Sequence, residues 1–442
     1  MDPCKYSATT LAETTERLAK DGAASSPNSG KDLENYGINC CSAYACTAKM
    51  MQPPMGCFAA HDSTPIVWPF QVYHRPQNAS DAMTAIPAQL TTESLQPSEM
   101  PRPRWTLRIE AFVWRKLIGL GMFLHRLRSP RPLSHSFRRS IPATVSPRKG
   151  AINLLFYTPR DYPGRHGDNR ASRYPVLVNF HGGGFTIGKA SDDARWATAV
   201  VETVGAVVVS VDYRLAPQYP FPTAVEDGVD AILYLLQNAE KLSIDAHKIR
   251  VSGFSSGGNM AFTVPLRLQD EIRRRRERYN ERQLTTGLPR SEGKVVVIMS
   301  WYPPTDFATN TREERRKTNI RPDKELPKYF TQLFDASYLY PPPYSISLSD
   351  PYLSPGIAPD DILRALPKDI IIYTCEWDGL RAETERLVGR LIRVPKKRVQ
   401  YRMLIGVSHA WDKSPNPFKR NLAREHAYGE ACIGLKRIFD KS

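Results

Sequence analysis

Long apolar runs are missing from this chain of 442 residues. A membrane-spanning helix needs about 18 or more consecutive apolar residues, and no uncharged stretch of that length occurs, so no spanning helix is predicted. The N-terminus, MDPCKYSATTLAETTERLAKDG, also lacks the apolar core of a secretory signal peptide. We therefore expect a cytoplasmic protein, with contact to a membrane surface as an alternative.

Cysteine is sparse and unevenly placed. Five of the seven cysteines lie in the first 60 residues: Cys4, Cys40, Cys41, Cys46 and Cys57. The other two, Cys375 and Cys432, have apolar neighbours, which is typical of buried free thiols. A disulfide framework is unusual in a chain this long. With 41% hydrophobic residues, the chain can instead be stabilised by an apolar core.

Motifs for nucleic-acid recognition are missing as well, although the net charge is +16. The basic residues are scattered over polar connectors, with one dense cluster at Arg273–Arg276 and several pairs between 102 and 150. No zinc-finger spacing or RNA-binding signature accompanies them. Such charge indicates a solvated or membrane-attracted surface, and no nucleic-acid partner is expected.

The first part of the chain divides into two segments. Residues 1–104 have no sustained periodicity and many Pro, Ser, Thr and Met residues, so we expect them to be largely disordered. Residues 105–148 contain a predicted helix at 105–127 and a connector. Apolar residues recur on one face of this helix at three- and four-residue spacing: Ile109, Val113, Leu117, Leu120, Leu124 and Leu127. Two placements fit this pattern, packing on the main domain, which we prefer, or lying on a membrane surface.

From residue 149 to 442, strand-like and helix-like segments alternate. Apolar runs rich in β-branched residues occupy 152–157, 176–180, 206–211, 249–252, 295–300, 370–375 and 399–404, and a helical pattern covers 224–237. This alternation predicts an α/β domain with a mostly parallel central sheet and helices on both faces. Residues 270–293 look like a helix extension and loop. The Pro-rich stretch at about 305–366 is too long for a connector and predicts an insertion over one end of the sheet.

The stretch RVSGFSSGGNM, at 250–260, follows a predicted strand and precedes a predicted helix. On its own it could be an ordinary Gly/Ser-rich loop. In this context it matches the G-x-S-x-G turn, which exposes a nucleophilic serine at the carboxyl end of a strand. The third residue of the pattern is Ser255, so Ser255 is the candidate nucleophile. Ser256, at the start of the helix, would contribute its backbone N–H.

A second glycine-rich stretch, VNFHGGGFTIG, comes directly after the strand at 176–180. Acyl transfer places negative charge on a carbonyl oxygen, and backbone N–H groups can stabilise it. Gly182 and Gly183, together with Ser256, would form this oxyanion hole, because glycine allows a close approach of the backbone. A phosphate-binding loop is the alternative, but no GxGxxG or Walker pattern follows. We expect His181 to orient the loop.

A serine nucleophile needs a base, and an imidazole base needs a carboxylate to orient it. Asp378 follows the predicted strand at 370–375, and His409 follows the one at 399–404. This is the chain order of Ser, acid and His expected for such a fold. Glu376 is a competing acid nearer the strand. His426 is a competing base, but it falls within a helical pattern.

These motifs together resemble the hormone-sensitive lipase family, esterases of the α/β-hydrolase fold, over roughly residues 174–435. VDYRLAPQYPFPTAVEDG (211–228), DPYLSP (350–355) and DGL (378–380) resemble further family landmarks. The resemblance implies the triad Ser255, Asp378 and His409, the oxyanion hole Gly182, Gly183 and Ser256, and a helical cap built from N-terminal residues and the insertion. The chain departs from the family pattern at Phe254, Ser256 and Gln218.

The sequence thus predicts a serine carboxylic ester hydrolase. It would act through an acyl-enzyme on small to medium acyl esters, with a small-molecule ester as its partner and no metal or organic cofactor. Two alternatives stay open. One is a ligand-binding receptor or scaffold of the same fold, although receptors of this family lack the histidine that is present here as His409. The other is a lyase or transferase that uses the same pocket.

Overall fold

The computed structural model describes residues 71–73, 102–163, 173–281, 293–341, 346–414, 418 and 420–441. All of them belong to one unit, Ser63–Ser442. Most of the segment expected to be disordered, 1–104, lies outside the described residues. Of the few residues described there, Gln71–Tyr73 form a short strand, β1, paired with residues 399–401.

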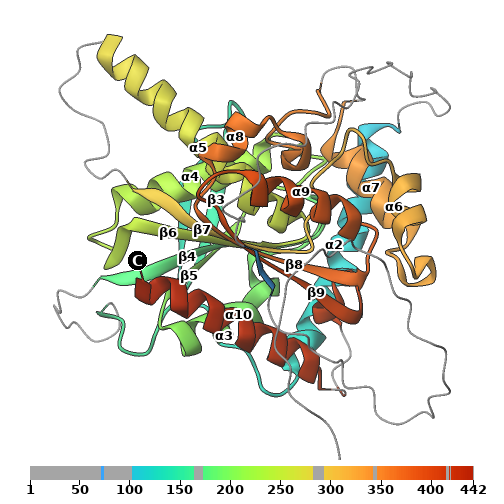
Figure 1. Cartoon of the computed structure of the whole chain (residues 1–442), viewed down its shortest axis with the longest axis horizontal. Helices are drawn as coiled ribbons and strands as arrows, with labels where there is room; N and C mark the ends of the chain where they lie inside the picture. Colours follow the sequence, from blue (N-terminus) through green and yellow to red (C-terminus); the bar gives the residue numbers. More distant parts are fainter. Residues whose placement is uncertain are drawn as a thin grey trace, which may run out of the picture. The chain divides into compact units, whose positions relative to one another are not determined.

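The described strands form one nine-stranded sheet in the order β1-β9-β8-β7-β6-β4-β5-β3-β2 (Figure 1). The strands after β1 are β2 (Phe137–Pro142), β3 (Ala151–Tyr157), β4 (Tyr174–Phe180), β5 (Val207–Asp212), β6 (Ile244–Phe254), β7 (Lys294–Trp301), β8 (Asp369–Trp377) and β9 (Arg398–Ser408). Neighbours from β5 to β9 pair in parallel, whereas β1, β2 and β3 pair antiparallel at the two edges. The predicted mostly parallel sheet is confirmed.

The central strands are apolar throughout because both faces of the sheet are covered. In β5, Val207 and Val209 belong to one apolar core and Val208 to the other, as expected where successive side chains point to opposite faces. Each core is completed by helices. Sequence alone could therefore locate these strands as continuous apolar runs.

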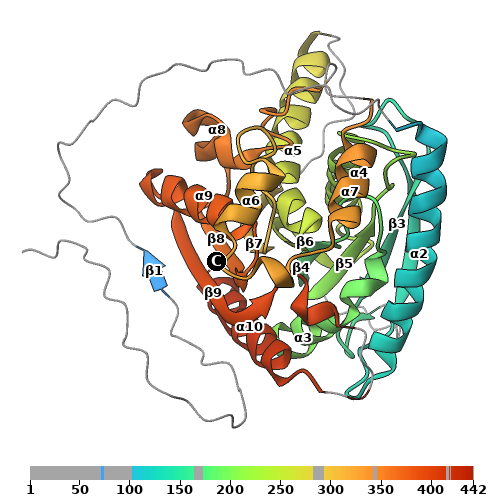
Figure 2. The same ribbon diagram turned by 90° about the vertical axis from the view of Figure 1, so that its right-hand side faces the viewer.

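Helices lie on both sides of the sheet (Figures 1 and 2). One side carries α3 (Ala194–Val204) and α10 (Leu422–Lys441), which pack on each other. The other side carries α4 (Thr223–Gln237), α5 (Ser256–Glu281) and α9 (Arg381–Arg393). Short 3₁₀ turns, η2 (Ala190–Asp193) and η6 (Trp411–Lys413), follow β4 and β9.

The chain between β7 and β8 is the long Pro-rich segment of the sequence. It contains α6 (Arg312–Thr318), η3 (Pro322–Lys324), α7 (Lys328–Tyr338), η5 (Pro355–Ile357) and α8 (Asp360–Ala365). Two charged contacts join α6 to its surroundings. Arg315 pairs with the buried Glu383 of α9 at 2.8 Å, and Arg312 donates to Asp335 of α7 at 2.7 Å. The segment between β7 and β8 is therefore structured, and α6 is tied to α7 and α9.

The predicted helix at 105–127 is α2 (Arg104–Leu127), and it packs against α7. Trp114 stacks on Tyr329, with 5.1 Å between the ring centroids. Arg115 donates to the backbone carbonyls of Thr186 and Ala216 at 2.8 and 2.7 Å. Thus α2 is held by aromatic stacking and by arginine contacts with a loop.

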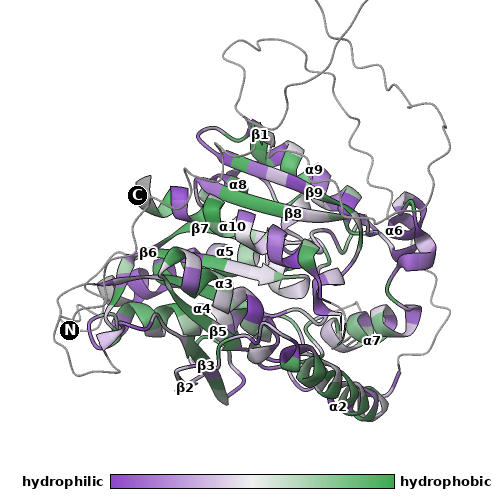
Figure 3. Ribbon diagram, turned by 90° about the horizontal axis from the view of Figure 1, so that it is seen from below, coloured by the Kyte–Doolittle hydropathy of each residue, from purple (hydrophilic) through white to green (hydrophobic). Residues whose placement is uncertain are grey.

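The structure corrects the expected burial of α2. The six apolar residues predicted to pack, from Ile109 to Leu127, are all at least 36% exposed. The buried residues lie on the opposite face of the helix: Leu107, Ala111, Met122 and His125. The spacing of apolar residues shows that the helix has an apolar face, but it does not show whether that face packs against the protein. The outward side of α2 is accordingly hydrophobic (Figure 3). No helix in the described part of the chain combines the length and apolarity needed to cross a membrane.

Candidate active site

Ser255 lies in the turn between β6 and α5, with its backbone in the left-handed region at φ +53°. Residues other than glycine rarely adopt this conformation, and it is concentrated at functional positions. A Cβ added to Gly253 would collide with the carbonyl of Gly257, and one added to Gly257 would collide with the carbonyl of Phe180. Glycine is thus required on both sides of Ser255, and the tight turn places this serine on the wall of a cavity.

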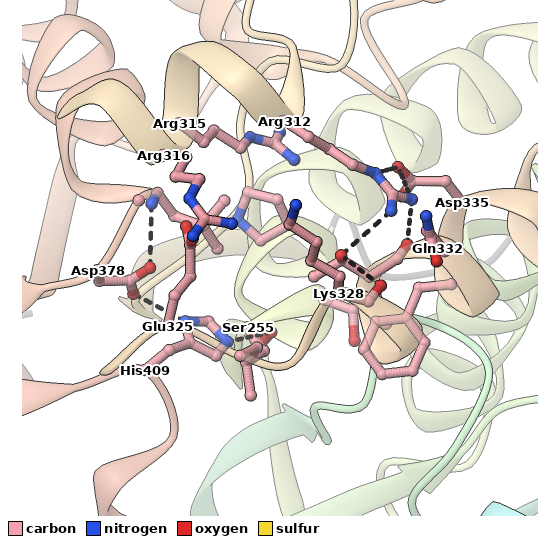
Figure 4. Close-up of a pocket in the computed structure, with 18 of the residues that line it drawn as sticks. Ser255, Arg312, Arg315, Arg316, Glu325, Lys328, Gln332, Asp335, Asp378 and His409 are labelled. Carbon is pink, nitrogen blue, oxygen red and sulfur yellow. Dashed lines mark hydrogen bonds and ion pairs between the residues drawn. The ribbon is translucent and has the colours of Figure 1, made fainter. Parts of the chain in front are cut away.

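His409 joins Ser255 to Asp378 in one chain of hydrogen bonds (Figure 4). Its Nε2 lies 2.9 Å from Ser255 Oγ, and its Nδ1 lies 2.7 Å from Asp378 Oδ2. The side chains of His409 and Asp378 are both only 5% exposed. The other carboxylate oxygen of Asp378 accepts from the N–H of Leu380 at 3.0 Å, which holds the carboxylate in place. The three residues come from the carboxyl ends of β6, β8 and β9, where such sheets bind ligands.

The two competing candidates lie elsewhere. Glu376 accepts a hydrogen bond from the N–H of Gly406 at 2.7 Å. His426 lies on α10 with its side chain 62% exposed, and its nearest carboxylate, on Glu430, is 4.0 Å away. Neither residue lines the cavity that contains Ser255. The structure therefore brings together Asp378 and His409 and leaves out Glu376 and His426.

The predicted oxyanion residues lie next to this turn. A Cβ added to Gly182 would be 3.0 Å from the Phe254 carbonyl oxygen and 3.4 Å from Cβ of Ser255. Gly183, the next residue, has φ +119°, which only glycine adopts readily. Hydrogen bonds between described residues leave the N–H groups of Gly182 and Gly183 unused. Ser256 is the first residue of α5, so its N–H has no acceptor within the helix.

His181 contacts the glycine loop and holds it through a hydrogen bond. Its ring stacks on Tyr213 with 4.2 Å between centroids, and its Nδ1–H donates to the Gly182 carbonyl at 2.8 Å. The Tyr213 hydroxyl donates to the His181 carbonyl at 2.8 Å. The histidine is 1% exposed. These contacts agree with the orienting role expected for His181.

A buried charged cluster behind His409 was missed by sequence reasoning. The Tyr302 ring lies edge-on to His409 at 4.9 Å, and its hydroxyl donates to Asp412 at 2.5 Å. The Lys413 ammonium lies 3.1 Å from Asp412 and 2.6 Å from Asp193. Burial would raise the pKa of Asp412, but Lys413 and the Tyr302 hydroxyl hold it below its ordinary value. The Tyr302 ring therefore links the imidazole to a buried ion pair of Asp412 and Lys413.

Phe254, one of the departures from the family pattern, belongs to an aromatic cluster beneath the turn. Its ring stacks on Trp301 at 5.4 Å and is covered by the Lys413 ammonium at 3.8 Å. Gln218, another departure, accepts from Arg115 of α2 at 3.2 Å. Phe254 therefore packs in the aromatic cluster, and Gln218 helps to hold α2 through a hydrogen bond.

A cavity of about 480 Å³ opens over Ser255 and His409. Apolar and aromatic side chains cover much of its wall: Phe185, Phe307, Leu326, Phe334, Tyr338, Trp377 and Leu380. Charged side chains from α6 and α7 also reach it, including Arg312, Arg316, Lys328 and Asp335 (Figure 4). Within the described residues, no three His, Cys, Asp or Glu side chains cluster as metal ligands would.

Comparisons with known proteins show the family to which the chain belongs. A family model for the alpha/beta hydrolase fold matches residues 177–413, more than half of the chain. An AB hydrolase superfamily protein of Schizosaccharomyces pombe is 43% identical over 199 residues, which are 45% of this chain and 52% of that protein. An arylesterase of Saccharolobus solfataricus is 32% identical over 243 residues, 54% of this chain and 69% of that protein. This chain therefore spans about half of the length of the fission-yeast relative and about two thirds of the archaeal one.

The fold is also similar to that of solved esterase structures. An esterase of Pyrobaculum calidifontis superposes with a TM-score of 0.57 at 26% identity, covering 74% of this chain and 93% of that chain. The fold and the arrangement of side chains define the class, an α/β hydrolase. The chain belongs to the hormone-sensitive lipase and carboxylesterase branch of that family, as its motifs predicted.

Proposed function

We propose that the protein hydrolyses carboxylic esters through a covalent acyl-enzyme on Ser255. One observation carries the proposal, the hydrogen-bonded chain from Asp378 through His409 to Ser255 on the wall of a cavity. A strained serine with a base within hydrogen-bonding distance, and a carboxylate orienting that base, is the arrangement that nucleophilic catalysis needs. Relatives named as esterases support the same chemistry.

In the proposed reaction, Ser255 Oγ attacks the ester carbonyl carbon while His409 Nε2 takes the hydroxyl proton. The negative oxygen of the tetrahedral intermediate accepts from the N–H groups of Gly182, Gly183 and Ser256. The C–O bond to the alcohol then breaks, and His409 gives its proton to the departing oxygen. Water attacks the acyl-enzyme in the same way, with His409 again the base, and releases the acid and free Ser255.

Substrate selection is assigned to a cap formed by α2, α6 and α7. The α7 helix contributes Phe334 and Tyr338 to the cavity wall, and the Phe334 ring lies against Gly184 of the glycine loop. A cavity of about 480 Å³ is within the range for small organic ligands. We therefore propose esters with small to medium acyl groups. Hydrolysis rates for a p-nitrophenyl series from acetate to palmitate test this, and a maximum at palmitate contradicts it.

A pair of adjacent serines provides the decisive test of the mechanism. Ser255→Ala should lower kcat on p-nitrophenyl butyrate by about 10⁴- to 10⁶-fold. Ser256→Ala should retain most activity, because the proposed contribution of this residue is a backbone N–H. A fluorophosphonate probe should label the wild type and the Ser256→Ala variant, but not Ser255→Ala.

The same measurements separate the alternatives. A receptor or scaffold would show neither probe labelling nor turnover. A lyase or transferase would be labelled but would give an eliminated or transferred product instead of acid and alcohol, which mass spectrometry of the products distinguishes. Loss of activity in Ser256→Ala with full activity in Ser255→Ala would refute the assignment of the nucleophile.

A further inference from the structure

The outward face of α2 is the largest concentration of exposed apolar side chains in the described part of the chain. Of the fourteen large hydrophobic side chains found exposed there, nine lie on this one helix. They are Trp105, Ile109, Phe112, Val113, Leu117, Leu120, Phe123, Leu124 and Leu127. We call these nine residues the outer face of α2. Scattered apolar residues on a surface need no explanation, but a contiguous apolar patch marks an interaction site.

The shape of this face fits a planar partner. The nine residues recur at spacings of one to four along a helix of 24 residues, which spans about 36 Å at 1.5 Å per residue. They lie opposite the buried residues Leu107, Ala111 and Met122, so they face away from the protein. A single straight helix with its apolar side outward offers a ridge rather than a groove. Such a ridge can sink into the boundary between lipid headgroups and acyl chains.

The charge around the face fits anionic lipid. The helix carries five Lys and Arg residues, of which Arg104, Arg115 and Arg126 donate to acceptors on the protein. Its one acidic residue, Glu110, is paired with Arg102. Arg108 and Lys116 are exposed and form no ion pair with any described residue. Lys116 lies over the Phe112 ring at 5.3 Å, and its long stem would let the ammonium reach the headgroups.

The same charges argue against a second copy of this chain as the partner. In a symmetric dimer the same patch meets itself, so the exposed Arg108 and Lys116 of one copy would come close to those of the other. Like charges across an interface are unfavourable. Anionic headgroups instead attract nearby Lys and Arg side chains.

The outer face also has a direct structural link to the cavity. Trp114, on the flank of α2, stacks on Tyr329 of α7, and Tyr329 is itself 45% exposed. The next turns of α7 line the cavity through Thr331, Phe334 and Tyr338. A membrane that held α2 would therefore lie close to the helix that forms the cavity wall.

We propose that the outer face of α2 binds reversibly to the surface of membranes that contain anionic lipid, with its aromatic and aliphatic side chains inserted below the headgroups. The helix lies in the plane of the surface and does not cross it. This surface binding is separate from ester hydrolysis and does not depend on it.

Vesicle flotation of the full-length chain tests the proposal, with phosphatidylcholine vesicles that either contain or lack phosphatidylserine. The test variant is Ile109→Glu/Leu120→Glu, whose wild-type side chains are 57% and 60% exposed. The matched control is Leu422→Glu/Ile433→Glu on α10, where the wild-type side chains are 58% and 50% exposed. Both variants add two negative charges at exposed apolar positions, so they differ only in location. Melting temperatures and p-nitrophenyl butyrate turnover confirm that each variant is folded.

We expect the wild type and the α10 variant to float with the phosphatidylserine vesicles, and more weakly at high salt or with phosphatidylcholine alone. The α2 variant should bind about tenfold more weakly or worse, because each inserted aliphatic side chain contributes roughly that factor. Equal flotation of the two variants, or no flotation of the wild type, overturns the proposal.

Sedimentation without vesicles adds one more outcome. A dimer that only the α2 variant converts to monomer would identify a second copy as the partner and also overturn it. Flotation requires no catalysis, so these results are independent of whether the chain hydrolyses esters.

Discussion

Replacing Asp378 with Asn should inactivate the enzyme although the two side chains have almost the same shape. In the wild type, one carboxylate oxygen accepts from the N–H of Leu380 at 3.0 Å, and the other accepts from His409 Nδ1 at 2.7 Å. The Asn carbonyl oxygen should take the position facing the Leu380 N–H, since only an acceptor fits there. Its NH₂ group then faces His409 Nδ1, which must become an acceptor. The imidazole proton is thereby moved to Nε2, where it blocks proton transfer from Ser255.

The magnitude follows from the loss of the correct tautomer. A comparable change in another triad lowers kcat by about 10⁴-fold, which corresponds to about 5 kcal/mol of transition-state stabilisation. Glu376→Gln is the matched control, because it makes the same chemical change two residues away. Its amide oxygen can still accept from the Gly406 N–H, which donates to Glu376 at 2.7 Å in the wild type. This variant should keep most of its activity.

The assay is kcat/KM on p-nitrophenyl butyrate for both variants, together with thermal melting to confirm the fold. Retention of more than about a tenth of the wild-type activity by a folded Asp378→Asn variant would contradict the tautomer argument. A greater loss in Glu376→Gln than in Asp378→Asn would show that Glu376 is the orienting acid.

Three further predictions concern residues outside the triad. Gly183→Ala should lower kcat by about 10²-fold or more, because φ +119° is unfavourable for alanine and the oxyanion loop must shift; unchanged kcat would exclude Gly183 from the site. Lys413→Met should lower the free energy of unfolding by about 3 kcal/mol or more, since it leaves the buried Asp412 and Asp193 without their cation; urea denaturation that shows no loss would refute this. Burial lowers the pKa of His125 to about 4, so between pH 6.5 and 4 only the unfolded state binds its proton and stability falls as the pH falls. A His125→Gln variant should show a correspondingly weaker loss of stability over that range, and an identical slope would contradict the shift.

The candidate site could be predicted from sequence because its chemistry is local in the chain. Glycines on either side of Ser255 are required by backbone clashes that involve only a tight turn and the neighbouring strand. The glycine run at 182–184 could be predicted as part of the site in the same way. Asp378 and His409 could also be predicted, because each follows a parallel strand and parallel strands bring their carboxyl ends to one edge of the sheet. The structure places Ser255, His409 and Asp378 within hydrogen-bonding distance.

Some strands escaped sequence reasoning for physical reasons. The β2 strand, with the sequence FRRSIP, lies at the edge of the sheet and is mostly exposed, so it has neither a continuous apolar run nor a clean alternation. The β1 strand has only three residues and is defined by its pairing with β9. Each of these strands is defined by its pairing with another strand, β1 with β9 and β2 with β3. The residues of β1 and β2 show no local pattern that predicts this pairing.

The sequence by itself determined the apolar strands, the nucleophile turn and the amphipathic character of α2, because each depends on the spacing of a few neighbouring residues. Only the tertiary structure decided which side of α2 meets the protein. The apolar side was expected to be buried, but Trp114 and Arg115 reach a stacking partner and backbone carbonyls from another side of the helix. The charged cluster of Asp412, Lys413 and Asp193 likewise exists only after folding, since it joins a residue that follows β4 to residues that follow β9. Which face of a helix is buried, and which charged side chains pair in the interior, depends on contacts between segments that are far apart in the chain. No single segment of the sequence contains that information.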